Sequence, residues 1–137
     1  MTHTGRCQCG DITFEVSADP LMSGQCHCLD CQKASGTGHT TMIAFPLGSV
    51  KIEGKTATYQ SPADSGATIT RYFCPRCGSR LFGSSSGMPQ LFTVNAGALD
   101  DPSPYKPMMT VYAKRLQPWD AVAAEAPSFD MMPPGGP

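Results

Sequence analysis

The chain has 137 residues, a formal net charge of −1 and 40% hydrophobic residues, so one small domain with a modest core is expected. It contains no run of Lys and Arg that would indicate nucleic-acid binding, and no stretch of about 18 apolar residues that could span a membrane. No apolar signal segment follows the first residues, which, together with unpaired cysteines, predicts a cytoplasmic protein.

The predicted elements are mostly short strands. Strict alternation of apolar and polar residues predicts a half-buried strand at 11–16. One helical turn closed by glycine is expected at 32–36. The segments 50–53 and 56–60 flank Gly54 and Lys55 and resemble a hairpin. Further strands are expected at 40–45, 68–73, 80–82, 90–95 and 110–113.

The 14 glycines and 13 prolines favour turns, so the expected fold class is mainly β, a small antiparallel β domain with metal-binding knuckles. From 119 onward the composition shifts to Ala, Pro, Met and Gly. A cluster near the end of the chain is expected to close over the core: Trp119, Phe129, Met131 and Met132. The domain is predicted to span residues 1–129, and 130–137 are predicted to form a loose tail.

Three of the seven cysteines, Cys26, Cys28 and Cys31, lie within six positions. In an extended segment Cys26 and Cys28 point to the same face, so His27 between them points away. A tight turn brings Cys31 to the same place. Three thiolates leave a tetrahedral zinc one ligand short, and such an open position distinguishes catalytic from structural zinc sites.

The other four cysteines form two pairs, Cys7/Cys9 and Cys74/Cys77, each at a strand end beside a glycine. Two such pairs suit one closed Cys₄ zinc site, so every cysteine is used by a division into four and three. Spacing alone leaves open a pairing of Cys26/Cys28 or Cys28/Cys31 with the Cys74/Cys77 knuckle. An iron–sulfur cluster needs four thiolates, and seven cysteines do not divide evenly into such sets.

Other polar residues are weaker candidates for a role in the site, as a metal ligand, a substrate contact or a general base. His3, His27 and His39 are each a possible fourth ligand of the three-cysteine site, although histidines more often have no such role. Lys33 and Arg71 are candidates for orienting an anionic substrate, or are simply solvated charges. The sequence does not single out a general base among His27, Asp30 and a bound water.

Three motifs together resemble the glutathione-dependent formaldehyde-activating (GFA) family. They are G-x-C-x-C-G-x-I-x-F at 5–14, C-H-C-x-x-C-x-K-x-x-G at 26–36 and F-C-P-x-C-G-S-x-L-F at 73–82. The segment 95–100 and the Pro-Trp pair at 118–119 are similar to the C-terminal half of the family, so the resemblance spans roughly 5–129.

The resemblance implies a compact Mss4-like β-tent with two zinc ions. By position, the structural ion would be held by Cys7, Cys9, Cys74 and Cys77, and the catalytic ion by Cys26, Cys28 and Cys31. It also implies a carbon–sulfur lyase, since the named family reaction joins formaldehyde and glutathione to S-hydroxymethylglutathione. The implied partner is therefore a small thiol or thiol adduct, although the chain carries no recognisable glutathione-binding signature.

A different class of function remains compatible with the same cysteines. A non-catalytic zinc-knuckle module would contact a protein or nucleic acid, but it has no need of a three-cysteine site, and a basic patch is lacking. A zinc-buffering or purely structural protein is a third reading. In the lyase reading, zinc acts as a Lewis acid on a thiol–carbonyl adduct, and a soft sulfur ligand suits a Cys₃ site.

Overall fold

The computed structural model describes residues 2–133, which form ten strands, one α-helix and two short 3₁₀ helices. In chain order the elements are β1 (His3–Arg6), β2 (Thr13–Val16), β3 (Met22–Cys26), α1 (Leu29–Ser35), β4 (Thr40–Pro46), β5 (Val50–Glu53), β6 (Ala57–Pro62), β7 (Thr68–Phe73), β8 (Arg80–Ser85), β9 (Leu91–Asn95), η1 (Ala96–Ala98), β10 (Met109–Val111) and η2 (Ala113–Arg115).

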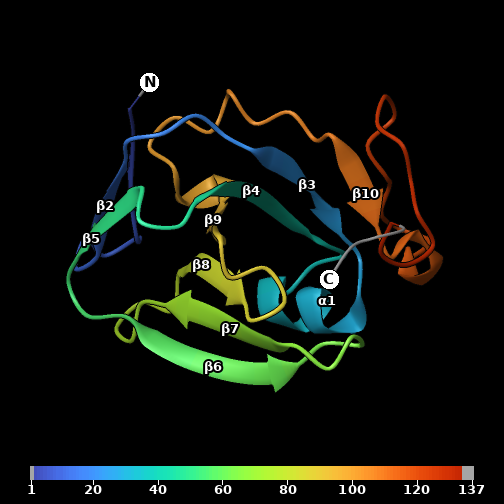
Figure 1. The fold of residues 1–137 in the computed structure, drawn as a ribbon, viewed down its shortest axis with the longest axis horizontal. Coiled ribbons are helices and arrows are strands. Elements are labelled where there is room, and N and C mark those ends of the chain that lie inside the picture. The colour runs from blue at the N-terminus through green and yellow to red at the C-terminus, as the bar shows by residue number, and fades with distance from the viewer. Residues whose placement is uncertain (1, 134–137) are drawn as a thin grey trace.

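Within the described residues the strands form two sheets, ordered β1-β2-β5 and β10-β3-β4-β9-β8-β7-β6. Neighbouring strands are antiparallel except β10, which runs parallel to β3. Figure 1 shows the long sheet curving from β10 and β3 at the top to β7 and β6 at the bottom, with β2 and β5 at its left end. The prediction of a mainly β, largely antiparallel domain is confirmed.

The core lies where the two sheets meet. In β2 the alternation seen in the sequence places Phe14 and Val16 inside and leaves Glu15 exposed. Phe14 meets Phe82 of the long sheet edge-on, with ring centroids 4.9 Å apart and an interplanar angle of 80°. Phe92 packs beside Phe82 at 5.4 Å. This aromatic contact joins the sheets, because apolar area buried between them is removed from water.

The predicted hairpin across Gly54 and Lys55 is wrong. β5 pairs with β2 in the short sheet, whereas β6 pairs with β7 in the long one. Gly54 has φ +99°, and a Cβ there would collide with the Asp11 carbonyl oxygen and lie 2.8 Å from Ile12 Cδ1. The glycine is therefore needed because the chain leaves the short sheet in tight contact with the loop before β2.

The single helical turn expected at 32–36 begins earlier, as α1, at Leu29. Cys28 is its N-cap residue, and its sulfur accepts the backbone N–H of Cys31 at 3.3 Å. Gly36, with φ 75°, closes the helix as expected. The start of the helix could not be predicted because cysteine is not a usual N-cap residue.

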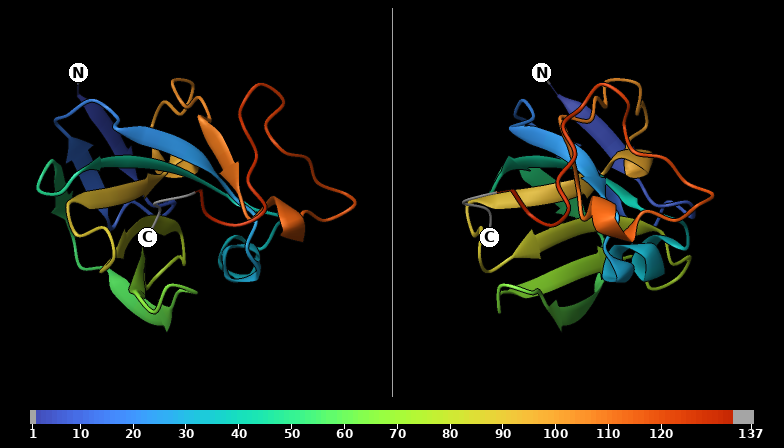
Figure 2. Two further views of the ribbon diagram at one scale, coloured as in Figure 1. Left: turned by 45° about the vertical axis from the view of Figure 1, so that its right-hand side comes forward. Right: turned by 90° about the vertical axis from the view of Figure 1, so that its right-hand side faces the viewer.

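The chain after β10 forms long loops at one end of the sheets (Figure 2). Phe129 and Met132 pack against the buried residues Cys26, Cys31 and Val111. Trp119 and Met131 are 67% and 43% exposed, so the prediction that these two close over the core is wrong. Of the predicted tail, 130–133 are described and Met131 accepts a hydrogen bond from the Tyr112 backbone N–H, while 134–137 lie outside the described residues.

Candidate metal centres

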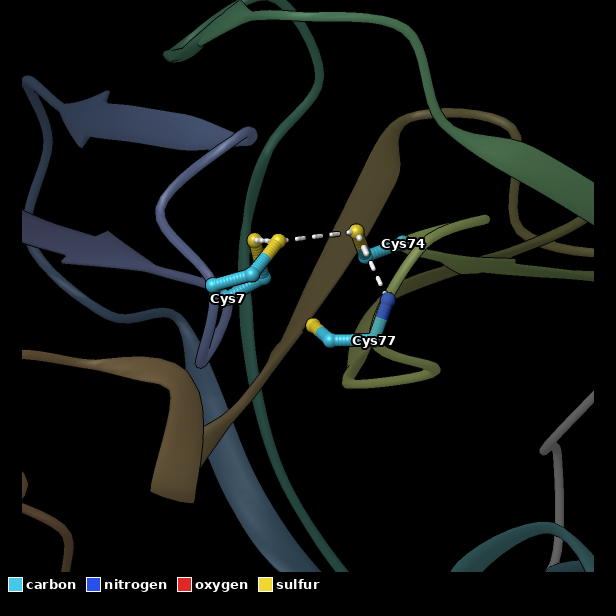
Figure 3. Close-up of side chains that lie close together, drawn as sticks. Cys7, Cys74 and Cys77 are labelled. Atoms are coloured by element: carbon cyan, nitrogen blue, oxygen red, sulfur yellow. Dashed lines mark hydrogen bonds between the residues drawn. The ribbon is translucent and has the colours of Figure 1, made fainter.

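The first candidate centre is a four-cysteine cluster formed by two loops. Cys7 and Cys9 follow β1 at the edge of the short sheet, and Cys74 and Cys77 lie in the turn between β7 and β8. Figure 3 shows Cys74 and Cys77 facing Cys7 across the gap between these loops. The cluster thus joins segments 65 positions apart, and the candidate ligand atoms lie within 4.8 Å of one another.

The sulfur spacing of this cluster fits a tetrahedral metal. Cys7 Sγ lies 3.6 Å from Cys9 Sγ, and Cys9 Sγ lies 3.7 Å from Cys74 Sγ. A tetrahedral zinc with Zn–S bonds of about 2.3 Å separates its sulfurs by about 3.8 Å. A disulfide would bring two sulfurs to about 2.05 Å, and all seven cysteines are free. The residues therefore fit a metal ion better than a covalent bridge.

The thiol pKa values differ widely within this cluster. The Ser79 hydroxyl and backbone N–H lower the pKa of Cys77 to about 5. At Cys9 the Asp11 backbone N–H favours the thiolate, but burial and three neighbouring sulfurs outweigh it and raise the pKa to about 12. Without a cation the cluster thus keeps some protons, which a bound metal would displace.

The second candidate centre is the three-cysteine cluster, Cys26, Cys28 and Cys31. Cys26 ends β3, Cys28 is extended with φ −61° and ψ 155°, and Cys31 lies in the first turn of α1. Cys26 and Cys31 are buried, at 8% and 6% exposure, whereas Cys28 is half-buried. The expected local geometry, an extended C-x-C followed by a turn, is the one found.

Within the described residues, no histidine, aspartate or glutamate joins Cys26, Cys28 and Cys31 to complete the set. The three thiols compete for protons: Cys28 and Cys31 raise the pKa of Cys26, and hydrogen bonds from Cys26 and Cys28 lower that of Cys31. The positive charge of Arg71 also lowers the Cys31 pKa. The cluster therefore offers a metal three sulfur ligands and leaves a tetrahedral ion one position short.

A third cluster was not recognised in the sequence: His27, His39 and Asp120. Cys26 pairs with Thr40 across β3 and β4, so His27 and His39 are the next cross-strand neighbours. Their rings lie 4.7 Å apart with an interplanar angle of 31°. His27 is fully buried, and burial lowers its pKa.

Asp120 reaches these histidines from the loop after η2. Its Oδ2 lies 2.6 Å from His39 Nδ1 and 3.6 Å from His27 Nδ1, and its Oδ1 accepts the Ala121 backbone N–H at 2.8 Å. Burial opposes ionisation of Asp120, but the hydrogen bonds from His39 and Ala121 outweigh it and lower its pKa. Gly38 makes room for the carboxylate, because a Cβ there would collide with it.

A cavity of about 1170 Å³ connects these features. All three cysteines of the three-cysteine cluster line it, as do His39 and Tyr112. Tyr112 has φ 56°, unusual for a residue with a side chain, and its hydroxyl donates to Asp64 Oδ2 at 2.7 Å. The charged residues of the lining are of both signs: Arg6, Arg71 and Arg80, with Asp30, Asp64 and Asp100.

The two basic residues considered in the sequence differ in position. Arg71 lines the cavity, where its guanidinium donates to the Ser61 hydroxyl at 3.0 Å. Lys33 is exposed on α1 and does not line it. Arg71 therefore stays a candidate for contact with an anionic ligand, and Lys33 is a solvated charge.

The sequence model of the family described as "Glutathione-dependent formaldehyde-activating enzyme" (GFA) matches residues 2–115. The chain belongs to the GFA family. The matched range includes all seven cysteines and the whole of both metal-binding candidates. Asp120 of the third cluster lies beyond it.

Similar proteins include a curated protein and a protein of known structure. A curated protein of Penicillium rubens, named "Putative glutathione-dependent formaldehyde-activating enzyme", is 34% identical over 80 residues. That match takes in 57% of this chain and 41% of the fungal protein, so the chain spans less than half of that relative's length. A crystal structure of a Rhodobacter sphaeroides protein superposes with a TM-score of 0.60 at 20% identity, covering 92% of this chain and 99% of that one. This second likeness supports the fold.

The structure groups the cysteines as four and three, the division expected from spacing, and brings no histidine into either group of the described residues. Metal occupancy and the catalytic role of Cys26, Cys28 and Cys31 stay predictions. The described helices include none long and apolar enough to cross a membrane.

Proposed function

We propose that this GFA protein is a zinc-dependent carbon–sulfur lyase acting on the adduct of a small thiol, such as glutathione, with formaldehyde or a related aldehyde. One observation carries the proposal: three sulfurs, which no fourth ligand joins among residues 2–133, line a cavity large enough for a tripeptide. The family description and the name of the fungal relative suggest glutathione and formaldehyde as the reactants.

The two cysteine clusters would hold different ions in this proposal. Cys7, Cys9, Cys74 and Cys77 would hold a structural zinc, and Cys26, Cys28 and Cys31 a catalytic one. A catalytic zinc would supply Lewis acidity and an affinity for thiolate, which suits the soft sulfur of a thiol substrate.

The charges of the cavity support a zwitterionic substrate. Glutathione carries two carboxylates and one ammonium group, and the cavity offers arginine and aspartate side chains for both signs. Arg71 is the arginine whose charge acts on Cys31, so it would hold a carboxylate of a thiol bound beside that cluster.

The remaining parts of the proposal follow from the sequence. The catalytic domain would comprise residues 1–129, and no nucleic acid or membrane partner is expected. Seven free cysteines suit a reducing compartment, the cytoplasm.

Cobalt substitution tests the proposal directly. Adding glutathione or a smaller thiol to the cobalt protein should shift the d–d and charge-transfer bands of the wild type, because sulfur replaces a water ligand. The Cys31→Ser variant, which loses this metal, should show no shift. A wild-type spectrum that is indifferent to every thiol would favour the non-catalytic zinc-knuckle module instead.

A further inference from the structure

The third cluster reaches the cavity through one residue, because His39 lines it and His27 and Asp120 do not. His39 is 19% exposed and lines the same cavity as Cys26, Cys28 and Cys31. His27 is fully buried and packs against the His39 ring, and the Asp120 carboxylate contacts His39 Nδ1. His39 directly precedes Thr40, and the strand register pairs Thr40 with Cys26 across β3 and β4. His39 therefore lies close to the end of β3 that carries Cys26.

The contact with Asp120 determines which nitrogen of His39 carries the proton. An ionised carboxylate only accepts hydrogen bonds, so His39 Nδ1 must donate to Asp120 Oδ2 at 2.6 Å. The other carboxylate oxygen is held by the Ala121 backbone N–H. His39 Nε2 then keeps its lone pair, and no hydrogen-bond partner for it exists among residues 2–133.

His27 packs against one face of the His39 ring. Its ring lies against that of His39 at a tilt of 31°, and its Nδ1 is buried without a hydrogen-bond partner, 3.6 Å from the same carboxylate oxygen. Its Nε2 faces Gln25 Oε1 at 3.2 Å. The His39 ring is thus held on one face by His27 and at Nδ1 by Asp120, an imidazole with a fixed orientation and one basic nitrogen left free.

A metal shared by these three residues fits the distances less well. Tetrahedral zinc with bonds of about 2.05 Å separates its ligand atoms by about 3.3 Å. The 2.6 Å between His39 Nδ1 and Asp120 Oδ2 is instead the length of a charge-assisted hydrogen bond.

We propose that His39 is the proton carrier of the lyase reaction, with Asp120 as the residue that positions it; this inference rests on the proposed function. In the direction of synthesis, Nε2 takes the proton from the substrate thiol. The sulfur electron pair forms the C–S bond while the carbonyl π pair moves to oxygen. The imidazolium then returns the same proton to that oxygen, giving the hydroxymethyl thioether with no net change in protons or electrons.

The main test uses the zinc-loaded protein and four variants, one of which, His39→Ala, serves for rescue by imidazole. His39→Gln keeps an N–H that can donate to Asp120 but removes the basic lone pair. Asp120→Asn removes the negative charge and replaces one accepting oxygen with an NH₂ donor, so the Nδ1–H tautomer of His39 is no longer imposed. His3→Gln is the matched control, because His3 lies in β1 and does not line the cavity.

Turnover is followed by exchange NMR of formaldehyde, glutathione and their adduct. His39→Gln should lower kcat by about 10² to 10⁴, with the zinc content and the KM for thiol unchanged. Asp120→Asn should also lower kcat, and the kcat of His3→Gln should match that of the wild type. Added imidazole should restore part of the activity of His39→Ala, which a merely structural role of His39 would not allow.

A proton count provides a readout besides activity. Calorimetry of glutathione binding at about pH 8, in buffers of different ionisation enthalpy, measures protons released to the solvent. The wild type should keep the thiol proton on His39, whereas His39→Gln should release about one proton more per thiol bound. Equal release by the two proteins, or equal kcat, would overturn the inference, as would a third metal ion per chain.

Failure of the lyase itself gives a different result. Wild-type protein that neither binds thiols nor turns over the adduct overturns the proposed function, whatever His39 does. Nitrogen-15 NMR of the imidazoles then decides the inference separately. An Nδ1–H tautomer at His39 that is lost in Asp120→Asn supports the assigned basic nitrogen, and an Nε2–H tautomer in the wild type overturns it.

Discussion

The sulfurs of Cys28 and Cys74 are candidate metal ligands and also accept a backbone hydrogen bond. Cys28 Sγ accepts the backbone N–H of Cys31 at 3.3 Å, and Cys74 Sγ accepts that of Cys77 at 3.5 Å. An ionised sulfur is a stronger acceptor than a thiol, so both C-x-x-C turns are stabilised by the thiolate form that metal binding requires. The same local turn thus serves a closed and an open cluster.

The two clusters should differ sharply in their effect on stability. Cys74 is fully buried, and Cys74→Ser would open a four-ligand site that joins two sheets, so Tm should fall by about 10 °C or more. Cys28→Ser makes the same chemical change at a half-buried N-cap, where serine is a preferred residue. That variant should stay folded and lose one zinc per chain.

Thermal melts followed by circular dichroism, with elemental analysis of each variant, check this comparison. If Cys28→Ser proved the more damaging of the two, the assignment of the four-cysteine cluster as the structural site would be wrong.

At the level of elements, β3 and its neighbours assemble the site. Cys26 pairs with Thr40 of β4 on one side and with Val111 of β10 on the other. The parallel pairing of β10 with β3 requires a long connection, and residues 27–108, which contain β4 to β9, provide it. The loop after η2 places Asp120 against His39, the residue directly before β4. No local sequence pattern indicates this contact.

The exit from β5 provides a test of how tightly the elements are packed. Gly54 and Gly48 have nearly equal φ angles, +99° and +91°, but a Cβ at Gly48 meets no atom within 4 Å. Gly48→Ala should therefore cost only the backbone strain, about 1–2 kcal/mol. Gly54→Ala should cost a further 1–3 kcal/mol or so, because the Asp11 carbonyl and Ile12 must move.

Denaturant unfolding curves of the two variants measure this difference. Equal losses of stability would show that the contact between the β5 exit and the loop before β2 is easily relaxed.

On the scale of the whole molecule, two of the contacts among the described residues that join the sheets bear on stability. One is the aromatic contact between Phe14 and Phe82, and the other is the four-cysteine cluster, which joins the loop after β1 to the turn between β7 and β8. The three-cysteine cluster lies at the end of β3 and links neighbouring elements. Loss of metal from the two clusters should therefore have unequal consequences for the fold.

Stepwise chelation tests this expectation. Protein made with adequate zinc should contain close to two zinc ions per chain, counted by elemental analysis. A chelator should remove the first ion with little change in circular dichroism, since an open site exchanges ligands readily, and the second ion together with unfolding. Iron with visible charge-transfer bands, or loss of both ions in one step, would contradict the assignment.

The sequence by itself determined the features that depend on short spacing. A C-x-C in extended chain and a C-x-x-C in a turn have nearly the same geometry in any fold, so the convergence of Cys26, Cys28 and Cys31 could be inferred, whereas spacing left open which pair joins Cys74 and Cys77. Alternation likewise identified β2, and the run at 68–73 became β7 with the same limits. These features follow from local stereochemistry, and the ordered motifs also indicated the family.

The tertiary structure alone decided what depends on contacts between distant segments. His39 and Asp120 are 81 positions apart, β5 and β6 are consecutive yet belong to different sheets, and Trp119 is exposed although its type favours burial. Each outcome reflects the packing free energy of the whole chain, which can outweigh local preference by a few kcal/mol. The proton carrier inferred for the cavity therefore became visible only when the register of β3 and β4 had placed two histidines against one distant carboxylate.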